Sequence, residues 1–228
     1  FDVLWEPRDI IGGDLWWISS EKFPGAFTLA VTDSTGHGVP GAMLSLLVNN
    51  SLERLHSAAS DLEPAQTLMQ LDVLVRSGLN QDAAEGDSDD GCDALILKID
   101  RQARRILFAG AKLDLFRVET TGEVHRYRGS RISLGYRQRA DVTEMPVTQE
   151  IVFNDGDLFF VVTDGFTDQP GGDPLRPCSL GYRRIEAWLG KLAGYNATEA
   201  LNSLRGTFAD WQGAQLRRDD VTALVFTL

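Results

Sequence analysis

The sequence predicts an α+β fold in which antiparallel sheets are covered by helices. Strand-like segments follow one another through short connectors such as "TTGE" and "NDGD", whose turn residues join antiparallel neighbours. Helical segments occur in consecutive pairs along the sequence. The chain has neither a GxGxxG segment after a first strand nor a GKS or GKT, which weakens the case for a dinucleotide-binding or P-loop fold. Together these three observations favour the α+β class.

Four segments have the apolar spacing of amphipathic helices. Each places apolar side chains three or four positions apart, so that they share one face. The four faces comprise Leu44, Leu47, Val48, Leu52 and Leu55; Leu68, Leu71, Val75 and Leu79; Ile185, Trp188, Leu189 and Leu192; and Leu201, Leu204, Phe208 and Trp211. We interpret these faces as core and assign them no chemistry.

Strand-like runs fill much of the remaining chain. They read "LWWI" and "FTLAVT", then "ALILKI", "RILFAGA", "LFRVET", "EVHRY" and "EIVF", and finally "DLFFVVT" and "VTALVFTL". Two polar stretches, "NQDAAEGDSDDGCD" and "DQPGGDPLRPCSLG", are predicted to be mobile loops. The first lacks the carboxylate spacing of a calcium loop, so we interpret it as a solvated flap rather than an ion site.

The composition argues against several classes of function. The formal net charge of -11 argues against nonspecific binding to nucleic acid or to an anionic membrane, because both are polyanions. The histidines and the two cysteines have no zinc-ligand spacing, and two unpaired thiols suit a reducing cytoplasmic setting. An acidic protein of this kind needs bound cations if it is to handle phosphate.

The sequence also predicts one domain, residues 1–228, that is a piece of a longer protein. It begins at Phe1 in strand-like sequence, without an initiator methionine. The longest apolar run, "GAMLSLLV", is too short to cross a bilayer, and the chain as given has no signal segment. We therefore expect a cytoplasmic domain that makes no direct membrane contact.

Two aspartates lie at the ends of consecutive strands. Asp14 opens the strand "LWWI", and Asp33 follows "FTLAVT". If these strands form a hairpin across "SSEKFPG", the start of one lies beside the end of the other, and both carboxylates share one sheet edge. The alternative for Asp33 is a plain capping or turn residue.

The same arrangement recurs near the end of the chain. Asp164 closes "DLFFVVT", while Asp219 and Asp220 open "VTALVFTL", so antiparallel pairing of these strands brings the carboxylates together. Such a cluster of like charges cannot stay fully ionised without a cation among them. Hard divalent ions with oxygen ligands, magnesium or manganese, are the expected partners.

Four motifs occur in order across nearly the whole chain: "EPRDIIGGDLWW", "VTDSTGHGVPGAML", "GDLFFVVTDGFTD" and "RRDDVTALVF". They resemble those of the bacterial metal-dependent protein phosphatases of the SpoIIE and RsbU type, relatives of PP2C. The resemblance implies a PP2C-like α-β-β-α sandwich, with two antiparallel sheets between helix layers. It also implies hydrolysis of phosphoserine or phosphothreonine on a protein.

The resemblance further implies a role for each aspartate. Asp33 bridges two Mg²⁺ or Mn²⁺ ions, and the backbone carbonyl of Ser34 is a further ligand. Asp14 serves the second ion, directly or through water, whereas Asp164 and Asp219 hold the first. A water held between the ions attacks phosphorus in line, so catalysis depends on Asp33, Asp164 and Asp219.

Some positions support the site or depart from the family pattern. Asp220 is expected to be a supporting residue, although the motif does not decide which of the adjacent aspartates is the ligand. Arg8, ahead of "IIGGD", is expected to bind phosphate, with a surface ion pair as the alternative. Thr35 stands where eukaryotic relatives have a histidine proposed as general acid, and His37 lies too far along to inherit that role. Lys112 replaces a usual family residue, which is expected to affect substrate fit.

Phosphatases of this type commonly act in partner switching. The expected substrate is a phosphorylated STAS-domain protein of the anti-anti-sigma-like kind, on which a counteracting kinase also acts. Two motifs are most similar to those of a membrane-anchored family member that controls aggregation and biofilm formation. The chain would then be the cytoplasmic output domain of a protein anchored in the inner membrane, and a homodimer is compatible with this. The alternatives are a catalytically silent partner-binding module and a small-molecule phosphohydrolase.

Overall fold

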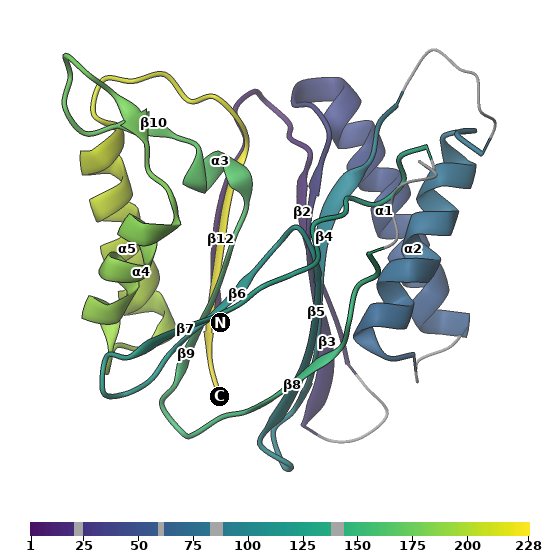
Figure 1. Ribbon diagram of the computed structural model, residues 1–228, viewed down its shortest axis with the longest axis horizontal. Coiled ribbons are helices and arrows are strands. Elements are labelled where there is room, and N and C mark those ends of the chain that lie inside the picture. Colours follow the sequence, from purple (N-terminus) through teal and green to yellow (C-terminus); the bar gives the residue numbers. More distant parts are fainter. Residues whose placement is uncertain (21–24, 59–61, 83–88, 138–143) are drawn as a thin grey trace.

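The computed structural model describes residues 1–20, 25–58, 62–82, 89–137 and 144–228. Two five-stranded antiparallel sheets lie face to face, with helices on the outer face of each (Figure 1). This layered order confirms both the α+β class and the PP2C-like α-β-β-α sandwich.

The first sheet combines the two ends of the chain with its middle. Its strand order is β1 (Asp2–Glu6), β12 (Val221–Thr227), β9 (Leu158–Val162), β6 (Leu115–Val118) and β7 (Val124–Tyr127). Its outer face is covered by α4 (Tyr182–Leu189), the 3-10 turn η1 (Gly190–Leu192) and α5 (Ala197–Gln212). The short helix α3 (Asp164–Thr167) follows β9 directly.

The second sheet is formed by four consecutive strands and one later strand at its edge. Its order is β2 (Asp14–Ser20), β3 (Ala26–Ser34), β4 (Cys92–Asp100), β5 (Arg105–Ala111) and β8 (Gln149–Val152). The helices α1 (Gly38–Ala58) and α2 (Pro64–Gly78) cover its outer face. The four predicted helical faces therefore all lie in the core, as expected from their spacing.

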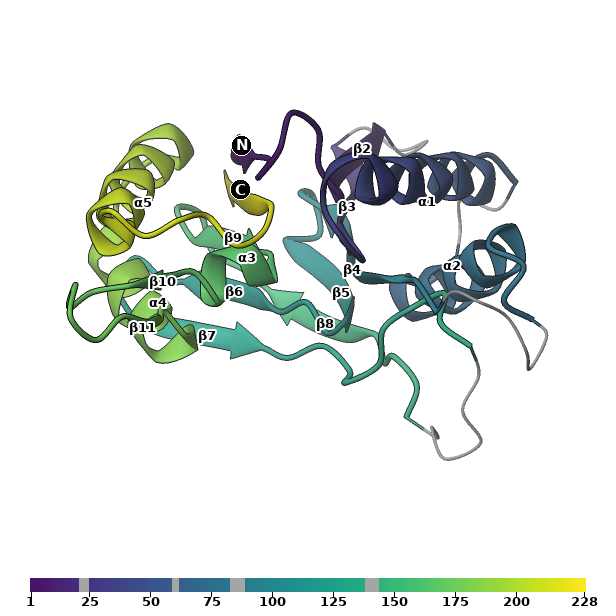
Figure 2. The same ribbon diagram turned by 90° about the horizontal axis from the view of Figure 1, so that it is seen from above.

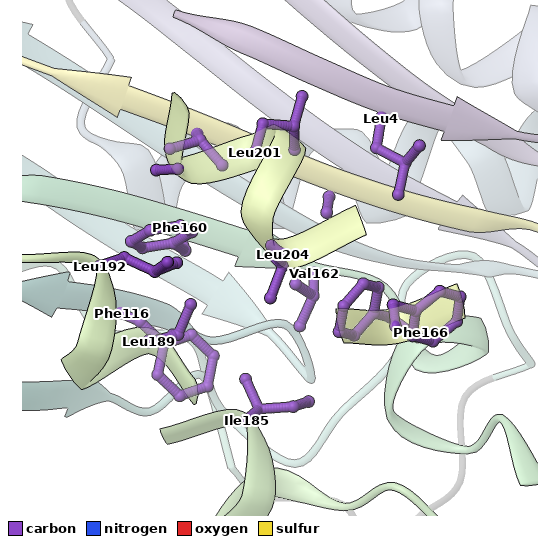
Figure 3. Close-up of a cluster of buried hydrophobic side chains, with 14 of the residues drawn as sticks. Leu4, Phe116, Phe160, Val162, Phe166, Ile185, Leu189, Leu192, Leu201 and Leu204 are labelled. Carbon is purple, nitrogen blue, oxygen red and sulfur yellow. The ribbon is translucent and has the colours of Figure 1, made fainter. Parts of the chain in front are cut away.

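The strands alternate between two environments because successive side chains point to opposite faces of a sheet. On β9, Phe160 and Val162 pack against α4 and α5, whereas Phe159 and Val161 face the other sheet. Figure 3 shows Phe160 and Val162 among the leucines of these helices. Burial on both faces explains why "DLFFVVT" and "VTALVFTL" are continuously apolar rather than alternating.

Local sequence signals fix the helix starts. Asn196 precedes α5 and forms a capping box with Glu199, each side chain accepting a hydrogen bond from the other residue's backbone amide. Glu63 and Gln66 form the same arrangement around Pro64 at the start of α2. Among the helices that the structure describes, none is long and apolar enough to span a membrane.

The two stretches predicted to be mobile loops have different outcomes. Within "DQPGGDPLRPCSLG" the structure shows a short hairpin, β10 (Pro170–Gly171) paired with β11 (Cys178–Ser179), so part of this stretch is paired strand rather than loop. Trp211 explains the order: its backbone carbonyl accepts from the Gly172 amide, and its indole donates to the Gln169 carbonyl. In the other stretch, residues 83–88 lie outside the described part of the chain.

The edge at which the predicted aspartates lie joins the two sheets. The connection from β1 to β2 crosses from one sheet to the other at the upper end in Figure 1, where α3 also lies. Figure 2 views the molecule from above and shows α3 near the middle, between the two pairs of helices. The start of β2 and the ends of β3 and β9 are thus brought to one place.

Candidate functional site

The β2–β3 hairpin positions two of the predicted residues. Its register places Asp14 directly opposite Asp33, as the alternation of the two strands predicts. The next strand, β4, places Asp93 on the other side of Asp33. Sequence reasoning missed Asp93, although it lies at the start of an apolar strand just as Asp14 does. Three carboxylates from three adjacent strands therefore share one end of the second sheet.

The first sheet contributes its carboxylates to the same place. β9 and β12 are antiparallel neighbours, as predicted, with Val162 opposite Ala223. Asp164 therefore lies beside the start of β12, which Asp219 precedes. The Asp164 amide is 3.4 Å from Oδ2 of Asp33, which connects the two sheets. The structure thus brings the predicted aspartates together at one edge of the sandwich.

Asp14 is a buried carboxylate, with 3% of its surface exposed. Its Oδ2 accepts a 2.8 Å hydrogen bond from the Thr163 hydroxyl, but its Oδ1 has no hydrogen-bond partner. Burial raises the pKa of Asp14 to about 7, and the charges of Asp220 and Asp164 act in the same direction. A buried oxygen without a partner is costly unless it meets a cation.

The neighbouring carboxylates are shifted in the same direction. Burial raises the pKa of Asp33 well above its ordinary value, and the charges of Asp14, Asp164, Asp93 and Asp219 add to the effect. The pKa of Asp164, which lies at the exposed rim, is raised to about 6 by partial loss of hydration and then by Asp219. It is therefore energetically unfavourable for all the carboxyl groups at this edge to be ionised at the same time.

Asp220 has a different environment from Asp219. Its two carboxylate oxygens accept hydrogen bonds from the backbone amides of Arg8, at 2.7 Å, and Gly13, at 2.6 Å. A Cβ at Gly12 would lie 2.7 Å from this carboxylate, so the close approach requires glycine. Asp220 fixes the β1–β2 connection to the start of β12, whereas Asp219 is only partly buried.

We expect Asp220→Ala to destabilise the domain by about 2–4 kcal/mol, because it leaves two backbone amides without their acceptor. Asp219→Ala is the matched control, since its main protein contact is a 2.9 Å bond from the Asp220 amide. Thermal unfolding of both variants without metal checks the prediction. Equal melting temperatures for the two variants would show that Asp220 does not fix the connection.

The Arg8 side chain lies over the loop between β3 and α1. Its guanidinium donates to the Arg218 carbonyl at 3.1 Å and contacts Nε2 of His37. Nδ1 of His37 is 2.6 Å from Asp9. Both ring nitrogens of His37 are thus engaged. Arg8 remains exposed at the rim of the carboxylate group.

Two further sequence positions can now be placed. The Ser34 carbonyl faces the β1–β2 connection, since a Cβ at Gly13 would lie 2.8 Å from its oxygen. The Thr35 hydroxyl donates to the Gly91 carbonyl at 2.9 Å and contacts the Tyr136 hydroxyl. Thr35 is therefore committed to the loop before β4, as a structural residue.

A tighter cluster of metal-ligating groups lies elsewhere. In the part of the chain that the structure describes, the side chains with mutual ligand-atom distances within 4.8 Å are Glu119, Glu123 and His125, around the β6–β7 turn. The Arg117 guanidinium is 3.4 Å from Glu119, so this cluster is an ordinary ion-pair network. The described aspartates of the sheet edge do not form a group of three whose ligand atoms all lie within 4.8 Å of one another.

The residues at the sheet edge nevertheless fit divalent cations. The donor set consists of carboxylate and carbonyl oxygens, which suit Mg²⁺ or Mn²⁺. The unpartnered Oδ1 of Asp14 and the raised pKa values of Asp14 and Asp164 are both relieved by a cation. The arrangement therefore suits metal-assisted chemistry on an anionic substrate.

Comparisons with known proteins agree with this geometry. The Stage II sporulation protein E (SpoIIE) family model matches residues 24–228. The SiaA-PP2C domain of Pseudomonas aeruginosa is 31% identical with a TM-score of 0.86, and the match covers 100% of this chain and 85% of that one. No curated protein sequence gives a significant match.

Two more distant structures share the fold. RsbX in complex with magnesium is 17% identical with a TM-score of 0.63, covering 98% of this chain and 92% of that one. The PP2C phosphatase domain of SpoIIE from Bacillus subtilis, solved with a fragment of its regulatory domain, is 15% identical with a TM-score of 0.70. That match covers 98% of this chain and 61% of the other.

The membrane-anchored family member that the two motifs were expected to resemble is SiaA, and the match to the SiaA domain confirms the resemblance. The family model covers three of the four motifs, and the first motif, at residues 6–17, precedes the matched span. The chain belongs to the SpoIIE family of PP2C-type serine/threonine phosphatases.

Proposed function

We propose that this domain uses two Mg²⁺ or Mn²⁺ ions to hydrolyse phosphoserine or phosphothreonine on a protein. The observation that carries the proposal is the meeting of carboxylates from both sheets at one edge. There Asp33 lies between Asp14 and Asp93, and the Asp164 amide is 3.4 Å from the Asp33 carboxylate. A partner-binding module has little need for such an arrangement.

Each residue has a role in this proposal. Asp33 and the Ser34 carbonyl would hold both ions, Asp14 would hold the second ion, and Asp164 and Asp219 would hold the first. When bound, the two ions would activate a water molecule and offset charge on the phosphoryl oxygens. The chain's own residues set the geometry: the buried Thr163 hydroxyl orients the Asp14 carboxylate.

The proposed substrate is a phosphorylated STAS-domain protein on which a counteracting kinase also acts. The chain would then be the cytoplasmic output domain of a longer protein anchored in the inner membrane. Both points rest on the family resemblance and on the match to the SiaA domain. The homodimer stays a prediction; α1 exposes Val39, Met43 and Leu46 on one face.

Turnover with manganese tests the function and its alternatives. The substrates are a phosphothreonine protein and p-nitrophenyl phosphate, assayed with the parent and with Asp164→Asn. Asp155→Asn is the matched control, because Asp155 lies at the opposite end of β9 in an exposed ion pair with Arg104. We expect Asp164→Asn to lose at least about 100-fold in kcat, as for loss of a group that stabilises developing charge.

The outcomes distinguish a protein phosphatase from a silent binding module and from a small-molecule phosphohydrolase. No turnover by the parent would favour a silent binding module. Turnover of small phosphate esters without turnover of the phosphoprotein would favour a small-molecule phosphohydrolase. Turnover that survives Asp164→Asn would contradict the assignment of the site.

Arg8→Ala tests the expectation that Arg8 binds phosphate. The backbone amide that Asp220 holds remains, so the change removes only the guanidinium. We expect KM for the phosphoprotein to rise by about tenfold, in line with the value of a charge-assisted hydrogen bond. Arg8→Lys keeps the charge and should recover part of the loss. A KM equal to that of the parent would leave Arg8 as a surface contact to His37.

A further inference from the structure

A basic groove lies beside the carboxylates, in a chain whose formal net charge is -11. It runs along the ends of β5, β6 and β7 and the start of α4. Figure 2 shows α4 beside β7 at this side of the molecule. The residues that define the groove are Lys112, Asp114, Arg126, Arg128, Arg131 and Tyr182.

One wall of the groove is a fixed scaffold. Nε of Arg126 donates to Oδ2 of the buried Asp114 at 2.6 Å, and its guanidinium carbon lies 3.4 Å from the centre of the Tyr182 ring. Asp114 also accepts from the Gly129 amide at 2.9 Å, which fixes the chain that follows β7. Arg126 is held in place and its charge is offset by Asp114.

The positive charges of Arg128 and Arg131 are not neutralised by acidic side chains of the described residues. Within the described residues, the guanidinium groups of Arg128 and Arg131 have no acidic partner, and both residues are exposed. Glu144 accepts from the Arg131 amide at 3.1 Å and not from its guanidinium. Lys112 has Asp93 as an acidic partner and Arg126 has Asp114 and Glu186, so the local positive field of the groove comes from Arg128 and Arg131.

Lys112 connects the groove to the candidate site. Its Nζ is 3.9 Å from Oδ1 of Asp93, the residue opposite Asp33. Its backbone amide donates to the Ser130 carbonyl at 2.8 Å, which places Arg131 next to it. A substrate residue at the carboxylates and a residue in the groove are thus separated by about one or two strand spacings, roughly 5–10 Å.

We infer that the basic groove binds an acidic segment of the protein substrate next to its phosphorylated serine or threonine. An extended chain advances about 3.3–3.6 Å per residue, so the acidic side chains would lie roughly one to three positions from the phosphorylated residue. The inference rests on the proposed function. It adds that the substrate is recognised by flanking Asp and Glu residues as well as by its phosphate.

Two phosphothreonine peptides test the inference with the full chain and manganese. One carries Asp and Glu on both sides of the phosphothreonine, and the other carries Asn and Gln in their place. We expect the parent to favour the acidic peptide by about tenfold in kcat/KM, mainly through KM, and 0.5 M salt to reduce the preference. p-Nitrophenyl phosphate, which has no flanking residues, serves as the reference substrate.

Charge-reversal variants of Arg128 and Arg131 test whether the groove causes the preference for the acidic peptide. In Arg128→Glu/Arg131→Glu, the ratio of kcat/KM for the acidic peptide to that for p-nitrophenyl phosphate should fall at least about tenfold. Arg128→Lys/Arg131→Lys should keep the ratio, because both charges remain. Arg101→Glu is the matched control: Arg101 is exposed in the turn after β4, at the strand end opposite Asp93.

The results distinguish this inference from the proposed function. If the parent hydrolyses both peptides equally, or if charge reversal leaves the preference intact, the groove is not a docking site although the enzyme is active. If the parent hydrolyses nothing, the proposed function fails. The docking role of the groove is then tested separately, by measuring binding of the unphosphorylated acidic peptide. Binding that the Arg128 and Arg131 reversal weakens tenfold supports the groove, and binding unaffected by it overturns the inference.

Discussion

Asp33→Asn is expected to abolish manganese-dependent hydrolysis and, at the same time, to raise the melting temperature of the metal-free domain. Asp33 is central to the carboxylate group, with Asp14 opposite it on β2 and Asp93 opposite it on β4. In the proposed function it would help to hold both ions. Its loss should therefore cost at least about 10³-fold in kcat, the upper end of what one charge-stabilising contact contributes.

The gain in stability follows from the same geometry. Burial and the charges of four neighbouring aspartates raise the pKa of Asp33, so the folded protein is destabilised when this carboxyl ionises. Asparagine has the same shape and carries no charge. Its carbonyl can still accept from the Asp164 amide. The destabilising charge is removed while the packing is kept, as is common for residues selected for activity.

Thermal unfolding at pH 7.5 in EDTA, together with turnover in manganese, checks both halves of this prediction. Asp155→Asn again serves as the control, because the same substitution in an exposed ion pair should change neither quantity much. An Asp33→Asn variant that is inactive and less stable than the parent would show that the Asp33 carboxylate supports the fold.

The metal-free domain is expected to lose stability between about pH 4 and pH 7. The pKa of Asp14 is raised from 3.8 to about 7 in the folded state. Below pH 4 this carboxyl is protonated in both states and costs nothing. As the pH rises, the unfolded chain loses its proton first, so unfolding becomes easier until the folded carboxyl also ionises near pH 7. At about 1.4 kcal/mol per pKa unit, the total is about 4 kcal/mol.

Melting curves of the parent and of Asp14→Asn across this range isolate the effect. The parent should fall relative to the variant by roughly 10 °C between pH 4 and pH 8, given about 2–4 °C per kcal/mol for a chain of this size. Magnesium or manganese at pH 8 should restore much of the difference in the parent, because a ligand of the folded state stabilises it. Parallel curves for parent and variant would mean that Asp14 is not the titrating group.

Local sequence patterns predicted much of this structure. The apolar faces of the four helices and the strand-like runs are determined by neighbours a few positions apart. The hairpin that places Asp14 opposite Asp33 was also predictable, because short connections between strands give antiparallel pairs. The short hairpin β10–β11 was missed because the distant Trp211 orders it.

The sequence by itself determined the fold class, the order of the four motifs and the aspartates that end or begin strands. Only the tertiary structure decided that Asp93 joins them, that Asp220 holds backbone amides over two hundred positions away, and that Arg128 and Arg131 lie beside the same edge. The physical reason is that strand neighbours and sheet-to-sheet contacts are set by packing of the whole chain. Periodicity within one segment carries no information about which distant segment lies beside it.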